Sequence, residues 1–507
     1  MFQQSVLSGI SKETCHAAIA TFAIEQGISF RSLSGPAWRK LVGVLKGAPH
    51  SYIPPDRNLL SGRLLDEQYE AMQKVVNTHI LNASMARMSI ASDGMTYMHK
   101  PFENYYVLCD GKVIFHSCED CTDQMIEGKK DGRFIAEGVI NVIKDVGPHN
   151  VLSVIMDGAS NMQVAGNIIT AKYPWVSVSH CLLHVVNLVV EDCIKNIEEF
   201  GEIAEDVADI ANFFNNHHAA HAQLAYQSKR HLGHELALII GSDVRMGKVI
   251  YCMHRVLRLK KALMAAAASA DLQNSVTDGD GVLDKLMDPE WWKKLVTYLS
   301  VLWPLHHLLR MTDFDKPIIG YVYPYIRDFL SYLQEKEADG NLWEQVLSFA
   351  ESRLGNWCGD LPMAAYFVNP FYFDEVYNSV ENSAVILQRV MKQVWHHLGE
   401  EAVEEKVMQC MAEWASYKTR SGPLHDADMK IAWKIAAANK RAPAQWWRVY
   451  GTGTPHLMEF AVAVLSQFVT AGACERGWKR YKVEKKSLHP CVALLPGDYF
   501  LLLNLPT

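Results

Sequence analysis

The sequence predicts a mixed α/β domain that is interrupted by a large all-helical insertion and preceded by short helices. Two observations predict the sheet: alternating segments on either side of Asp110-Gly111, and an almost continuously apolar run at 151–156. A third observation predicts the insertion, because apolar and aromatic residues recur at three- and four-residue spacing through most of residues 195–429. The expected fold class is therefore α/β plus all-α.

The first 85 residues are expected to form short helices that lead into the sheet. Gly35-Pro36 and Pro54-Pro55 break this part of the chain, because proline disfavours a helical residue before it. The first strand then runs from Met88 to Asp93. Segments 104–109 and 112–117 flank Asp110-Gly111, a pair typical of a two-residue hairpin.

Helices and strands alternate after this hairpin. Apolar residues at 135, 139, 142 and 146 predict a helix that stops at Gly147-Pro148, and the helix after the 151–156 strand ends at Tyr173-Pro174. Residues 176–179 predict a fifth strand and 181–194 another helix. Three antiparallel strands, then helix, strand, helix and strand, is the order of a ribonuclease H-like fold, in which the first and fourth strands are adjacent.

Three carboxylates are candidates for one catalytic site. Asp93 and Asp157 each end a predicted strand and precede a glycine, and an acid at that position faces the mouth of a sheet. Glu475 lies far along the chain in Cys474-Glu475-Arg476. Together they could hold two Mg²⁺ or Mn²⁺ ions about 3.5–4 Å apart and cut a phosphodiester. The competing interpretation is that Asp-Gly pairs are ordinary turns.

Short motifs along nearly the whole chain occur in the order and at the distances of one family. They are Tyr52-Ile53-Pro54-Pro55, Ser92-Asp93-Gly94, Asp157 to Asn161 with Ala165-Gly166, Cys181-Leu182-Leu183-His184, Trp446-Trp447, Pro455-His456-Leu457, Ala461 to Leu465 and Cys474-Glu475-Arg476. In this order they resemble the transposases of the hAT superfamily, whose ribonuclease H-like domain is interrupted by a helical insertion.

The resemblance implies a function, partners and domain limits. It implies metal-dependent DNA cleavage and strand transfer by Asp93, Asp157 and Glu475, in a nuclear protein that binds DNA and itself. The expected parts are an N-terminal helical segment at 1–85, the first part of the catalytic domain at 86–194, an all-α insertion at 195–435 and a dimerisation region at 436–507 that completes the catalytic domain. We expect the dimer interface to use the large apolar residues of that region: Trp446, Trp447, Leu457, Phe460, Val464 and Phe468.

Several residues associated with the predicted catalytic site depart from the family pattern. Met95 stands where a tryptophan usually follows Asp-Gly, and Met246 follows Arg245 where an aromatic residue is typical. In the family that aromatic is associated with a flipped base at a DNA hairpin, and methionine cannot stack as an aromatic ring does. Gly477 and Lys479 replace the polar residues that more usually follow Glu-Arg in the family.

DNA contacts must be local, because the net charge is −7 and binding to DNA depends on Lys and Arg. The best basic stretch is Lys479, Arg480 and Lys482, directly after Glu475. Arg245 and Arg476 are further candidates for DNA contacts through the resemblance. A solvated helix face is the alternative interpretation of such a charge run.

Composition predicts a soluble protein of a reducing compartment. No apolar run reaches the roughly 18 residues of a membrane span, no secretory signal is evident, and the eleven cysteines lack a disulfide-scaffold pattern. Cys118-x-x-Cys121 and Cys181-x-x-His184 have the spacing of zinc ligands. We expect buried free thiols rather than a structural zinc, with Cys181 and His184 packing beneath the helix after the fifth strand, as in the family.

An N-terminal zinc finger, usual in related transposases, is missing from this part of the sequence, since Cys15 is the only cysteine before residue 100. Either the gene model is truncated or the recognition module was lost. Two alternatives to an active transposase follow. The first is a domesticated copy that keeps the fold as a dimerising nuclear DNA-associated or protein-interaction module, and the second is an ordinary ribonuclease H-like nuclease.

Overall fold

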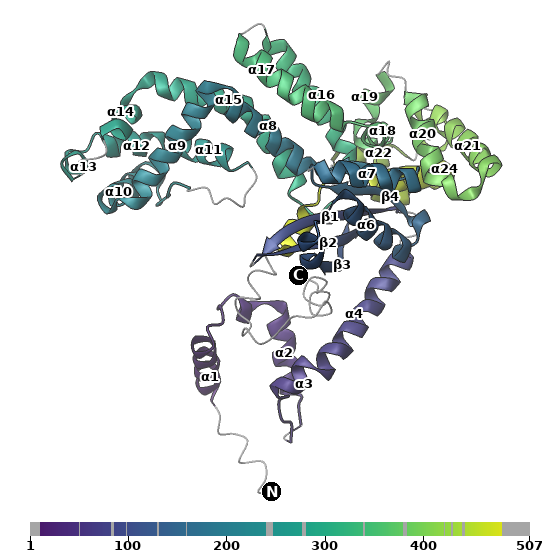
Figure 1. Cartoon of the computed structure of the whole chain (residues 1–507), viewed down its shortest axis with the longest axis horizontal. Coiled ribbons are helices and arrows are strands. Elements are labelled where there is room, and N and C mark those ends of the chain that lie inside the picture. The colour runs from purple at the N-terminus through teal and green to yellow at the C-terminus, as the bar shows by residue number, and fades with distance from the viewer. Residues whose placement is uncertain are drawn as a thin grey trace. The chain divides into compact units, whose positions relative to one another are not determined.

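The sheet has the strand order predicted from the sequence. The computed structural model describes residues 11–49, 51–82, 86–97, 99–128, 131–158, 160–239, 247–275, 280–337, 340–378, 383–419, 421–426, 429–438 and 442–478. Its five strands are β1 (Met88–Tyr97), β2 (Lys100–Cys109), β3 (Lys112–Asp120), β4 (Val151–Met156) and β5 (Ser177–His180). They lie in the order β3-β2-β1-β4-β5, and Figure 1 labels the first four strands of the chain, β1 to β4.

Strand directions agree with a ribonuclease H-like sheet. β1, β2 and β3 are antiparallel neighbours, whereas β4 runs parallel to β1 and β5 runs parallel to β4. The hairpin at Asp110-Gly111 is confirmed, because these two residues have φ values of 50° and 73° and so match the positive-φ turn that the pair favours. The α/β part of the predicted fold class is therefore confirmed.

Apolar layers cover both faces of the sheet. One face packs on α6 (Gly132–Val146) and α7 (Ser160–Lys172), in a core that contains Ile90, Val107 and Val154. The opposite face packs on α8 (Leu182–Asn196) and on described residues of the C-terminal region, among them Phe468 and Cys474. All six residues of β4 are buried, which explains its continuous apolar run.

After α8 the described residues of the insertion form helices. In the described residues between 195 and 430 no strand occurs, which confirms the predicted insertion. Its helices are α9 (Glu198–Asn216), α10 (His218–Leu232), α11 (Lys248–Arg258), α12 (Lys260–Ala267), α13 (Ala270–Ser275), α14 (Asp280–Met287), α15 (Pro289–Thr312), α16 (Ile319–Lys336), α17 (Asn341–Ala350), α18 (Asp360–Phe367), α19 (Phe373–Asn378), α20 (Ser383–Trp395), α21 (Glu400–Lys418) and α22 (Lys430–Ala438).

The chain then returns to the sheet. After α23 (Pro443–Tyr450) and α24 (Pro455–Leu465), the Gln467 side chain donates to the Arg87 carbonyl at 2.7 Å and accepts hydrogen bonds from the hydroxyls of Ser89 and Ser153 at 2.9 and 2.8 Å. The Phe468 amide also donates to the Ser89 hydroxyl. These buried bonds fix the segment before Glu475 on β1 and β4.

The N-terminal helices are α1 (Lys12–Glu25), α2 (Pro36–Lys46), α3 (Arg57–Ser61) and α4 (Arg63–Asn82). The expectation of short helices fails for α4, which is 20 residues long and contains neither of the proline breaks. Internal contacts divide the chain into two compact units, residues 1–67 and 68–507. The four predicted domain limits stay predictions. No helix in the described residues is long and apolar enough to span a membrane.

Candidate active site

Asp93 and Asp157 lie at the same edge of the sheet. The pairing of β1 with β4 ends at Ala91 and Ile155, so each aspartate lies two residues beyond the last paired position of its own strand. Asp157 directly follows β4, as predicted. The expectation that Asp93 ends its strand is wrong, because β1 continues to Tyr97 as the antiparallel partner of β2.

Glu475 belongs to a short helical segment, residues 472–478, that packs on β2. The Asn104 side-chain amide donates to the Cys474 carbonyl at 3.3 Å, and the ring centroids of Phe102 and Trp478 are 6.5 Å apart. A Cβ atom on Gly477 would lie 2.0 Å from the Tyr106 hydroxyl, so only glycine allows this close approach. The helix thereby lies beside Asp93, which pairs with Asn104 in the sheet.

The charges that act on Asp93 indicate that the three predicted carboxylates lie close together. The Asp93 side chain is half-buried, and its pKa is raised well above the usual range, first by burial and then by the negative charges of Glu475, Glu103 and Asp157. Every charge that acts on Asp93 in this way is negative, so the site is an acidic cluster whose repulsion a cation would relieve.

Glu103 is a carboxylate that the sequence reasoning missed. It is fully buried in β2, and it accepts a hydrogen bond of 2.6 Å from the Ser92 hydroxyl. The sequence did contain a signal for Glu103, namely an acidic residue inside the strand segment Phe102-Glu103-Asn104-Tyr105. Such a residue is notable because a buried carboxylate is rare unless it has a partner.

Trp478 was also missed. Its buried indole N–H donates to Oδ2 of Asp93 at 3.1 Å, across a sequence separation of 385 residues. This bond lowers the Asp93 pKa, against the larger effects that raise it. The indole therefore occupies one side of the carboxylate that the sequence assigned to metal binding.

The site has the charge for a divalent cation but lacks a ready set of ligands. In the part of the chain that the structure describes, no group of three or more His, Cys, Asp and Glu side chains is placed to hold a metal ion. The carboxylate oxygens are nevertheless the ligand type that Mg²⁺ and Mn²⁺ prefer. The donor chemistry thus fits, and the ligand arrangement would have to tighten on binding.

Cys181 joins three parts of the site scaffold. Its amide donates to the Met156 carbonyl at 2.6 Å, and its sulfur accepts a hydrogen bond of 3.3 Å from the Ala471 amide. His184 lies one turn along α8, and its ring is 3.7 Å from the Cβ position of Gly158. These contacts agree with the expected packing of Cys181 and His184. Cys118, expected just past the third strand, lies inside β3.

The predicted DNA contacts divide into two groups. Arg245, Lys479, Arg480 and Lys482 lie outside the described residues. Arg476 is described, and its guanidinium donates to the Asp313 carbonyl at 3.0 Å and pairs with the carboxylates of Asp313 and Asp315. Because these carboxylates offset its charge, the geometry favours a structural role for Arg476 over the expected phosphate contact.

The residues predicted to form the dimer interface are buried inside the chain. Trp446 and Phe468 are each 5% exposed, and the other four, Trp447, Leu457, Phe460 and Val464, are 0% exposed. The indole N–H groups of Trp446 and Trp447 donate to carbonyls of the same chain. The surface argument for this interface is therefore wrong, because α24 is a core helix, enclosed by α18, α20, α21 and α23, rather than a surface one.

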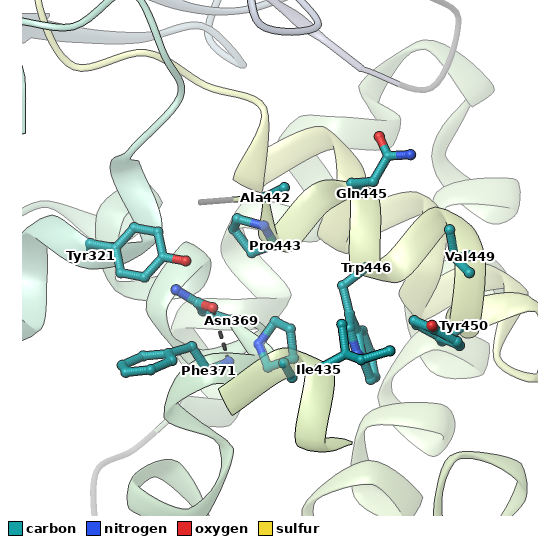
Figure 2. A pocket seen from close by; sticks show the side chains of 12 residues that line it. Tyr321, Asn369, Phe371, Ile435, Ala442, Pro443, Gln445, Trp446, Val449 and Tyr450 are labelled. Carbon is teal, nitrogen blue, oxygen red and sulfur yellow. Dashed lines mark hydrogen bonds between the residues drawn. The ribbon is translucent and has the colours of Figure 1, made fainter. Parts of the chain in front are cut away.

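Trp446 lines a cavity of about 160 Å³ between α16, α22 and α23 (Figure 2). Tyr321, Phe371 and Tyr450 also line it, and the ring of Trp446 lies between Ile435 and Tyr450 in this view. A different cavity, of about 300 Å³, lies beside β5 and the Phe468-Val469 segment. It is lined by His180, whose ring lies 3.2 Å from the Asp157 carbonyl, and by Trp357, whose indole donates to the His180 carbonyl.

Comparison with known families gives a match in the part of the chain that contains β1 to β5. A family described as a domain of unknown function (DUF659) matches residues 55–210, which include Asp93 and Asp157 but not Glu475. This family occurs in hAT-type transposase-like proteins. No curated protein matches the chain. The sheet topology is that of a ribonuclease H-like fold with a helical insertion, and residues 55–210 are similar to a family that occurs in transposase-like proteins.

Proposed function

We propose that the chain is a hAT-like transposase, or a protein derived from one, that cuts and joins DNA at Asp93, Asp157 and Glu475. The observation that carries this proposal is that Glu475, distant in sequence, acts electrostatically on Asp93 together with Asp157. Acids from two adjacent parallel strands and a later helix are the type of ligand that a two-metal phosphodiester-cutting site uses.

Within this proposal the carboxylates hold the cation and set the position of the phosphate. A bound Mg²⁺ or Mn²⁺ ion would supply a Lewis acid that lowers the pKa of an attacking hydroxyl and offsets charge on the phosphate. Asp157, at the open end of β4, and Glu475, on the 472–478 helix, approach the site from different elements. Asp93 would share its Oδ1 oxygen with the cation, because Trp478 donates to Oδ2.

The test is cleavage of supercoiled plasmid DNA by the purified full chain with Mg²⁺ or Mn²⁺. We expect Asp157→Asn and Glu475→Gln each to remove nicking, because each loses an anionic oxygen ligand with little change in volume. Asp120→Asn, which changes an exposed aspartate on β3, is the matched control and should nick like the parent. Retained nicking by Asp157→Asn would assign the cleavage elsewhere.

A second candidate function is favoured by Trp478. Because its indole N–H occupies Oδ2 of Asp93, the chain could instead be a catalytically inactive, domesticated transposase that keeps the fold as a nuclear DNA-associated or protein-interaction module. Metal binding distinguishes the two functions. The active site predicts that Mg²⁺ or Mn²⁺ raises the melting temperature of the parent but not of Asp157→Asn, whereas the inactive module predicts no effect on either.

Partners and location belong to the same proposal. We propose a nuclear protein that binds DNA and associates with itself. The exposed apolar side chain of Val449 on α23, 53% exposed, belongs to the C-terminal region and is available for association, as is that of Ile431 on α22, 69% exposed, at the end of the insertion. Sedimentation of the intact chain measures the oligomeric state.

A further inference from the structure

A strip of rings and basic side chains runs along α11 and α15. The ring centroids of Tyr251 and His306 are 4.8 Å apart, and those of His254 and Trp303 are 4.7 Å apart. Residue numbers rise along α11 as they fall along α15, so the two helices are antiparallel. Trp303 also stacks on His306, with centroids 4.6 Å apart. The four rings thus form one continuous, half-exposed row.

Basic groups lie at both ends of this row. Arg258 follows His254 by one turn of α11, Arg310 follows His306 by one turn of α15, and both are exposed. We call the set Tyr251, His254, Arg258, Trp303, His306 and Arg310 the α11/α15 strip. It is about 16 Å long, the length of the 11-residue helix α11.

The electrostatic surroundings of the strip are positive, although the whole chain is acidic. Residues 248–270 contain five Lys and Arg and residues 291–312 contain three, and neither segment contains an Asp or Glu. The charges that act on His254 are those of Arg258 and Arg255, and those that act on His306 come from His307, Arg310 and His254. In a protein of net charge −7, such a local reversal of sign indicates an anionic ligand.

The acidic helix α9 does not cancel this charge. It packs against both α11 and α15, but Asp206 on it is paired with Lys285 and with the Trp291 indole. Glu199 and Glu202 act on Tyr298 instead. No acidic group affects His254 or His306 in the described residues.

One end of the strip leads to the acidic cluster. Arg310 lies 4.0 Å from Asp313, at the outer limit of an ion pair, and so keeps more of its charge for a phosphate than Arg476, the neighbour of Glu475, which pairs with both Asp313 and Asp315. The Thr470 hydroxyl also donates to the Thr312 carbonyl at the end of α15. The helix that carries the strip is therefore bonded directly to the segment that carries Glu475.

We propose that the α11/α15 strip binds a single strand of nucleic acid and leads it toward the acidic cluster. Guanidinium groups suit phosphates, and half-exposed rings suit unpaired bases, whose faces are hidden in a duplex. An acidic peptide would use the arginines but not the row of rings. This inference rests on the proposed function for the destination of the strand, but not for its binding, which needs no metal.

The experiment measures binding of the full chain to a fluorescent single-stranded DNA oligonucleotide in EDTA at several salt concentrations. Arg258→Gln/Arg310→Gln should weaken binding about tenfold or more and make the slope of log K against log salt shallower by about 1.4, or roughly 0.7 for each lost phosphate contact. Lys392→Gln/Lys430→Gln removes two exposed charges from α20 and α22 and is the matched control. It should bind like the parent.

A ring variant separates nucleic acid from other anions. Trp303→Leu should weaken binding about fivefold or more without changing the salt slope, because stacking is lost but charge is kept. Its melting temperature, and those of the arginine variants, verify that the fold is intact. If Trp303→Leu binds like the parent and a polyglutamate peptide competes fully with DNA, the ligand is an acidic protein and the proposal is wrong.

Two further outcomes are decisive. Equal affinity for duplex DNA, or an equal loss of binding in the lysine control, would overturn the assignment of a single strand to this strip. Asp157→Asn should bind the oligonucleotide like the parent. Failure of the cleavage proposal therefore appears as absent nicking with binding intact, whereas failure of the strip appears as binding that the arginine and tryptophan variants do not change.

Discussion

At the scale of single residues, Asp93 lies where ionisation of its carboxyl is unfavourable. It lies among Glu103, Asp157 and Glu475, and burial adds to the repulsion between these carboxylates, so that its pKa is well above normal. Only the Trp478 indole acts in the other direction, among the influences on Asp93 within the described residues. An acidic cluster of this kind costs stability in the absence of a cation, which is common at functional sites.

Replacing Asp93 should therefore stabilise the metal-free fold. A carboxyl whose pKa is raised in the folded state loses stability as pH rises above the unfolded value of about 3.9, and the loss is complete above the folded pKa. Asp93→Asn removes this loss, so we expect its melting temperature in EDTA to exceed that of the parent by an amount that grows from pH 4 upward. The gain follows from the raised pKa of Asp93, since each unit of pKa shift corresponds to about 1.4 kcal/mol.

The control for this measurement is Glu404→Gln, which neutralises an exposed carboxylate on α21. It should leave the pH dependence of melting unchanged. A parent and an Asp93→Asn protein that melt together at every pH would show that the cluster is not repulsive, and would remove the electrostatic support for a cation site.

At the scale of elements, the 472–478 helix is the part that completes the site, and its position depends on Gly477. A methyl group there would meet the Tyr106 hydroxyl at 2.0 Å. Sequence comparison gave Gly477 only as a departure from the family pattern. The structure gives it a steric reason, because the helix backbone lies directly against a large residue of β2.

We expect Gly477→Ala to destabilise the chain and displace Glu475. Alanine improves helix propensity by about 1 kcal/mol, but overpacking typically costs about 1–3 kcal/mol and a contact this short is at the upper end. Adding Tyr106→Phe removes the clashing oxygen and should restore most of the lost stability. Thermal unfolding measures both effects.

The matched control is Gly43→Ala, a helical glycine of α2 whose Cβ position has open space. It should be neutral or slightly stabilising. If Tyr106→Phe does not rescue Gly477→Ala, the helix is not held against β2 by this close approach.

At the scale of the whole molecule, the C-terminal region is part of the core rather than an added module. Phe460, Val464 and Leu465 are buried in the same cluster as residues of β1, α8 and the insertion helices. A deletion from residue 440 would therefore expose that core, so it cannot serve as a clean test of self-association.

We expect the chain truncated after residue 439 to lose its cooperative thermal transition, because the buried partners of α18, α20 and α21 are removed. Removal of residues 1–62, which precede α4, is the control and should keep that transition, since residues 68–507 form a compact unit with its own core. Circular dichroism during heating compares the two proteins. A cooperative melt of the 1–439 chain would contradict the structural role of α23 and α24.

Local patterns in the sequence determined the elements and their order. Alternation, an apolar run and the Asp110-Gly111 turn predict β2, β3 and β4, because side-chain period and turn conformation are properties of adjacent residues. The pairing of β1 with β4 also followed, since the order of strands and helices leaves few topologies. The amino-acid sequence by itself therefore places Asp93 and Asp157 at one edge of the sheet.

Only the tertiary structure decided which residues that are far apart in the sequence come into contact. Glu103 and Trp478 join the Asp93 environment, and Arg476 pairs with Asp313, through contacts between residues that pattern analysis treats separately. From the sequence alone, the apolar residues of α24 are consistent with either an interface or a core, because a sequence gives the hydrophobicity of a residue but not the surface that it contacts. Burial settled that choice in favour of the core, since the insertion helices enclose α24 in three dimensions.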